Sequence, residues 1–201
     1  MKKSIEKITY CFVIIAALFV SFVSFVEPLV MKDINITKVI LVLLCYAAVF
    51  AGSLTLFRQL SERVLYYLII AGIFAAVIVQ TYIVFHMRLV PNHIYDYCVD
   101  MVETGKISFG ESKYFAYNTN NIPLAIVIYY VFRMAAFTGM DYRIAAGLFN
   151  VLLILVMYVS AFLILKKVTT IRTTAVYMAL LLTNPSFYAY ASYYYTDTIS
   201  A

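Results

Sequence analysis

Residues 64–85 read VLYYLIIAGIFAAVIVQTYIVF and contain no charged side chain. A helix needs about 20 apolar residues to cross the roughly 30 Å hydrocarbon core of a bilayer, and this stretch is long enough. Four further charge-free windows reach a similar length: residues 8–26, 39–57, 144–165 and 173–196. A sixth window, residues 123–138, is shorter and carries Arg133 near its end. The pattern predicts an all-α fold, a polytopic transmembrane helical bundle of about six membrane segments.

Composition supports the same class. The chain of 201 residues is 65% hydrophobic and 12% charged, with a mean hydropathy of +0.92. A water-soluble domain of this size lacks the polar surface to cover such a chain. The net charge of +5 comes from Lys and Arg near the ends of apolar windows, where they orient helices and touch lipid headgroups. We therefore expect membrane lipids as partners and no nucleic acid. The oligomeric state is left open.

The N-terminal lysines predict a multi-pass plasma-membrane protein whose N-terminus is cytoplasmic. The first apolar run continues to Val26 without a small-residue cleavage site, so we interpret it as a retained helix. Residues 1–63 would form two N-terminal helices, and residues 64–201 a second membrane module with an outer loop at 86–121. Simple alternation then places Lys166, Lys167 and Arg172 outside, against the positive-inside tendency. Either residues 123–138 do not fully span, or the charge bias is small here.

The outer loop is the one long polar stretch. Residues 92–104 are expected to form a short interfacial helix that ends at Gly105, a favourable C-cap residue. Asp96, Asp100 and Glu103 recur at helical spacing and share one face. The opposite face, with Tyr95, Val99 and Val102, would lie in lipid. The acidic face is either a solvated surface or a carboxylate cluster for general-base work or a divalent cation.

Three other features are candidates for chemistry. The apolar window after residue 173 meets Asn184-Pro185, and a tyrosine-rich run then leads to Asp197. This aspartate either faces a cavity or is an ordinary helix-start residue. His86 and His93 are interfacial residues or candidate metal ligands. Arg133 either binds a lipid phosphate or snorkels to the headgroups.

Taken in order, several motifs resemble the N-terminal part of membrane glycosyltransferases of the GT-C superfamily, near the protein-mannosyltransferase-like families (family 39-like). The likeness covers roughly residues 64–201. These motifs are the loop helix DMVETGK at 100–106, the segment YFAYNTNNIPL at 114–124, Arg143 and Asn150 on a later helix, and the Asn184-Pro185 to Thr196-Asp197 run.

The resemblance implies transfer of a sugar from a polyprenyl-phosphate-type lipid carrier to an acceptor at the outer membrane face. It implies Asp96 as base or metal ligand and Asp197 in the same cavity. The following residues are the supporting, substrate-binding or metal candidates: Asp100, Glu103, Arg133, Asn120, Asn121 and His93. The cofactor is unknown, with a divalent cation as the candidate.

Two departures from the family pattern leave an alternative open. The family's loop aspartate falls near Pro91-Asn92, where this chain has no acid, and Thr119 replaces a frequent proline. Family members also continue through further helices, so the chain is expected to be a truncated and inactive fragment or an N-terminal part. The alternative is a non-catalytic integral membrane protein, either an assembly partner or part of a transporter. All four prolines sit at segment ends, which counts against a transporter.

Overall fold

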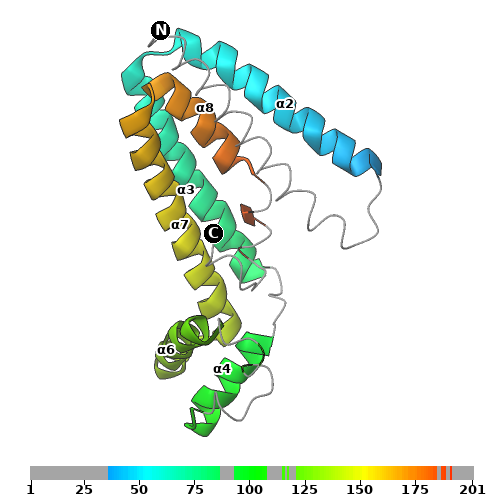
Figure 1. Ribbon diagram of the computed structural model, residues 1–201, viewed down its shortest axis with the longest axis vertical. Helices are drawn as coiled ribbons and strands as arrows, with labels where there is room; N and C mark the ends of the chain where they lie inside the picture. Colours follow the sequence, from blue (N-terminus) through cyan, green and yellow to red (C-terminus); the bar gives the residue numbers. More distant parts are fainter. Residues whose placement is uncertain are drawn as a thin grey trace. The chain divides into compact units, whose positions relative to one another are not determined.

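The computed structural model describes residues 36–86, 93–107, 115, 117, 121–184, 187, 188 and 191. This part of the chain is helical and contains no strand, as predicted (Figure 1). Six helices are described: α2 Ile36–Gln59, α3 Glu62–His86, α4 His93–Thr104, α6 Ile122–Thr138, α7 Tyr142–Val168 and α8 Ile171–Leu182. The predicted window 8–26 lies outside the described residues.

Two of the described helices are long and apolar enough to cross a membrane, α3 with 25 residues and α7 with 27. At about 1.5 Å per residue each exceeds the roughly 30 Å that a bilayer core requires. Only 28% of the most apolar window of each helix is buried. A core helix of a water-soluble protein would be mostly covered, so the exposure of these apolar faces agrees with a lipid environment.

The windows at 123–138 and 173–196 form shorter helices. Asn121 precedes α6 with Pro123 in the first turn, and Gly139 ends the helix in the left-handed conformation at φ +70°. The helix α8 begins at the N-cap Thr170, whose side chain accepts a hydrogen bond from the Thr173 amide, and ends at Leu182. Residues 173–196 are therefore not one uninterrupted helix. The Asn184-Pro185 pair that follows explains the stop, because proline disfavours the α conformation in the residue before it.

The chain divides into two compact units, and the division runs through α3 and α7. Unit 1 holds residues up to Gly72 and Phe162–Ser186, and unit 2 holds Ile73–Ala161 with the C-terminal residues. The boundary expected after residue 63 stays a prediction.

In unit 1, α2 packs against α8, and the start of α3 meets the end of α7. The ring of Tyr66 contacts Phe162 edge-on at 5.3 Å, and Lys166 Nζ lies 4.7 Å from the centre of the same ring. Gly72 leaves room for Leu182, because a Cβ there would lie 2.9 Å from the Leu182 Cδ1.

In unit 2, the end of α3 meets the start of α7. Val84 packs with Val151 and Ala191 in a small apolar cluster. A Cβ at Gly147 would lie 2.5 Å from Val84 Cγ1, so the glycine permits close approach of the two helices. One turn before Val84, Gln80 bonds to Tyr158 further along α7. Within unit 2 the two helices therefore run antiparallel. The helix α4 lies against α6, and their buried side chains form an apolar core together with Phe115 and Ala146.

Candidate functional site

The helix α4 is held in place because one of its sides packs against α6. Ile94, Tyr95, Cys98 and Met101 are all buried in a cluster with α6. The Cys98 thiol donates a hydrogen bond to the Ala125 carbonyl at 3.4 Å. The predicted loop helix is thus confirmed, but its apolar side does not lie in lipid. It packs on protein, and Val99 and Val102, expected at the centre of that face, lie at its half-buried margin.

The three carboxylates of α4 share the opposite side. Asp96, Asp100 and Glu103 are all exposed, as their spacing predicts. The helix ends at Gly105, whose φ is +69°. Only glycine adopts this conformation without a steric penalty, so the predicted C-cap is confirmed. The result is a rigid helix that presents an acidic face.

A hydrogen bond joins Tyr95 to Arg143, near the start of α7. The guanidinium is the donor, because arginine carries no acceptor. Burial raises the pKa of the Tyr95 hydroxyl, and the bond and charge of Arg143 partly oppose that rise. The charges of Asp141 and Asp96 also act on this hydroxyl. The start of α4 therefore lies beside the start of α7, and Asp96 and Arg143 are close to the same phenol.

The turn before α7 fixes the backbone of Arg143. Asp141 Oδ1 accepts a hydrogen bond of 2.7 Å from the Arg143 backbone amide. Asp141 and Arg143 are both exposed. The exposed carboxylates of Asp96 and Asp141 suit general-base chemistry, and the guanidinium of Arg143 suits the binding of a phosphate.

The other predicted site residues are spread more widely. Arg133 is exposed on α6, and Asn121 is half-buried at the N-cap of that helix, where its side chain makes no capping bond. His93 is the first residue of α4, and its side chain lies outside the described part. Asn120 and Asp197 also lie outside it, so the expected meeting of Asp96 with Asp197 stays a prediction.

Metal binding finds no support in the described part of the chain. Its residues contain no group of three His, Cys, Asp or Glu side chains that could hold a metal ion. His86 instead stacks on Tyr82, with ring centres 3.9 Å apart, and its Nδ1 lies 2.8 Å from the Tyr82 carbonyl oxygen. These contacts are those of an ordinary interfacial histidine.

Sequence reasoning gave the phosphate role to Arg133 and missed the contact between Tyr95 and Arg143. The available signal was the Gly139 stop followed by Asp141 and Arg143, a turn that gathers charge at the start of a helix. Arg143 was noted from the sequence only as one of the motifs that resemble the GT-C superfamily. Searches of protein-family models, of curated proteins and of solved structures find no match for this chain.

Proposed function

We propose that the chain is an integral membrane glycosyltransferase, or part of one, that moves a sugar from a polyprenyl-phosphate-type carrier to an acceptor. The observation that carries this proposal is the position of Asp96. It is an exposed carboxylate in the first turn of a helix anchored by burial, and it directly follows Tyr95, to which Arg143 is hydrogen-bonded. In this proposal Asp96 is the base and Arg143 is the cation that binds the phosphate.

The membrane setting rests on α3 and α7. Both are long enough to span, and both expose large apolar side chains, including Phe74 at 69%, Ile78 at 62% and Ile164 at 61% exposed. Large apolar side chains exposed in this way are costly in water and favourable in lipid. A donor with a polyprenyl tail would lie in the same bilayer.

The pairing of α3 with α7 supports one orientation in the membrane. In unit 1 the α2–α3 and α7–α8 turns meet at one end, where Arg58 and Arg172 line one pocket. Positive-inside bias makes this end cytoplasmic. If α3 crosses outward and α7 crosses back, residues 87–141 begin and end on the outer side, and α6 alone does not cross. The lysines that simple alternation placed outside then lie inside, and Asp96 lies outside.

The transfer reaction requires a general base and a group that stabilises the departing phosphate. The acceptor hydroxyl gives its proton to a base as its oxygen attacks the anomeric carbon of the sugar, and the bond from that carbon to the phosphate oxygen breaks. Asp96 takes the proton. The departing lipid phosphate gains negative charge, which the Arg143 guanidinium stabilises. Asp100 lies one turn further along the same exposed face and is a matched control.

The experiment uses membranes from cells that express the full chain, supplied with polyprenyl-phosphate mannose or glucose carrying a radioactive sugar. We measure label transferred out of the lipid fraction. Asp96→Asn removes the base and should reduce the rate of sugar transfer at least about 100-fold, which is within the range of general-base effects. Asp100→Asn should retain most of it. Equal rates in the two variants would remove Asp96 from the chemistry, and no transfer by the unmodified chain would favour the non-catalytic alternative.

A further inference from the structure

An apolar pocket of about 400 Å³ lies between α2 and α8 in unit 1, far in sequence from the acidic helix. Phe50, Leu54 and Phe57 line it from α2, and Val176 and Leu180 line it from α8. Its volume falls within the roughly 300–1,000 Å³ typical of small-molecule sites. Such walls suit a hydrocarbon ligand.

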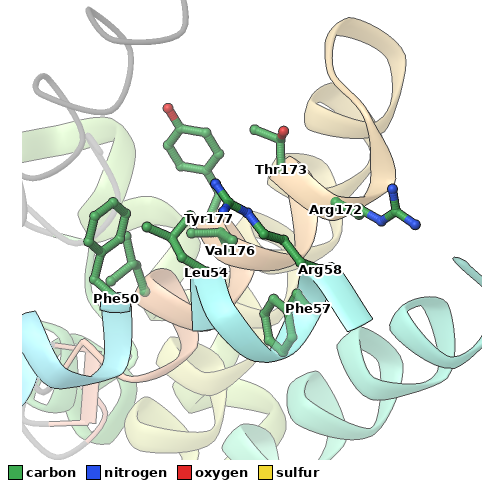
Figure 2. Close-up of a pocket in the computed structure, with 9 residues that line it drawn as sticks. Phe50, Leu54, Phe57, Arg58, Arg172, Thr173, Val176 and Tyr177 are labelled. Carbon is green, nitrogen blue, oxygen red and sulfur yellow. The ribbon is translucent and has the colours of Figure 1, made fainter. Parts of the chain in front are cut away.

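The polar lining residues are Arg58 near the end of α2, and Arg172, Thr173 and Tyr177 in the first two turns of α8. Figure 2 shows Phe50 at one end of the pocket and Arg58 and Arg172 toward the other. The Arg58 side chain extends toward the α8 side, where Tyr177 lies, while the Arg172 guanidinium points away from it (Figure 2). Both arginines are exposed, so both are accessible to a headgroup.

The helix ends beside Arg58 and Arg172 are strongly cationic. Residues 58–63 and 166–172 carry five cations and one acid, Glu62. Lys166 is engaged over the Tyr66 ring, whereas Arg172 lies in the first turn of α8. The positive end of the helix dipole disfavours a cation there, and a bound anion would relieve that repulsion.

We infer that this pocket binds one anionic phospholipid of the cytoplasmic leaflet. An acyl chain fills the space between α2 and α8, the phosphate binds the Arg58 guanidinium, and the exposed Arg172 side chain turns toward it when the lipid is bound. Charge complementarity selects the headgroup, because anionic lipids are attracted to basic pockets between helices on the cytoplasmic side. The apolar walls select a lipid over a free phosphate. This site depends on the membrane orientation above but not on any role of Asp96.

The test is native mass spectrometry of the purified full chain, titrated in detergent with phosphatidylglycerol, phosphatidylcholine or glycerol phosphate. The chain should retain phosphatidylglycerol in preference to phosphatidylcholine. Each arginine near the surface contributes about a fivefold change in affinity, so Arg58→Gln with Arg172→Gln should weaken retention by about 25-fold. Lys167→Gln, at the same end but outside the pocket lining, is the control and should cost much less.

A second variant tests the pocket itself. Leu54→Trp fills the apolar space and leaves both arginines in place, so it should displace the lipid while the circular dichroism spectrum is unchanged. Three results would overturn the proposal: equal retention of the two lipids, equal losses in the arginine and Lys167 variants, or glycerol phosphate binding as tightly as the lipid. The last would assign the cations to a free phosphate and leave the pocket without a role.

Discussion

The side-chain amide of Gln80 on α3 donates a 3.1 Å hydrogen bond to the phenolic oxygen of Tyr158 on α7, and both side chains are completely buried. Gln80 Oε1 has no hydrogen-bond partner among the described residues. A buried polar group on a membrane helix is costly unless it is bonded. This pair therefore links the parts of α3 and α7 that belong to unit 2.

The two partners should respond differently to substitution. Tyr158→Phe leaves the Gln80 amide without its acceptor and should destabilise the fold by about 1 kcal/mol, near the upper range for bonds between membrane helices. Gln80→Met removes the amide together with its unsatisfied oxygen and should be close to neutral. Unfolding in mixed micelles measures both. In the double variant the cost of Tyr158→Phe should shrink, and an unchanged cost would show that the bond is not the cause.

Gly147 and Gly52 provide a second pair of substitutions, one in a tight contact and one in open space. Gly147→Ala places a methyl group 2.5 Å from Val84 Cγ1, on a short and stiff side chain. Such overpacking should cost about 1–3 kcal/mol. Gly52 on α2 has nothing within 4 Å of a Cβ, so Gly52→Ala should instead stabilise by about 0.5–1 kcal/mol. The same unfolding assay compares them, and a tolerated alanine at 147 would contradict the close approach of α3 and α7.

These elements mark what the sequence could predict. Charge-free windows located α2, α3 and α7 within a few residues, because membrane-length apolar runs leave no alternative structure. The face of α4 that carries Asp96 followed from spacing alone. Two features did not follow. The apolar face of α4 was assigned to lipid, although α6 covers it, because periodicity shows which side is buried but not what buries it. The role of Arg143 required the Tyr95 contact, which joins residues 48 positions apart.

The thiol of Cys98 should be almost unreactive in the folded protein. Burial raises its pKa to about 12, so the reactive thiolate is scarce at pH 8. In a variant that keeps only this cysteine, maleimide should label it after denaturation in dodecyl sulfate and not before. The folded thiol also keeps a proton that an unfolded thiol releases above pH ~8.5. Stability should therefore fall as pH rises from about 9 to 11, and less so in Cys98→Ala. Rapid labelling of the folded protein would contradict the packing of α4 on α6.

Substitutions of Arg143 and Arg133 test which of these two arginines binds the phosphate. Arg143→Gln should raise the KM for a polyprenyl-phosphate sugar by about tenfold, as expected for loss of one charged hydrogen bond. Tyr95→Phe should cause a smaller rise, because it only releases the guanidinium. Arg133→Gln, on the exposed side of α6, should change little. A larger effect at Arg133 would return the phosphate role to that residue.

Both the candidate site and the lipid pocket depend on the sides of the membrane at which they lie. Single cysteines at Asp96 and Lys167, in a cysteine-free background, can be labelled on whole cells with an impermeant maleimide. We expect Asp96→Cys to react from outside and Lys167→Cys to react only after permeabilisation, because the proposed orientation puts Asp96 on the outer side and Lys167 on the cytoplasmic side. Labelling of Lys167→Cys from outside, or protection of Asp96→Cys, would contradict this account.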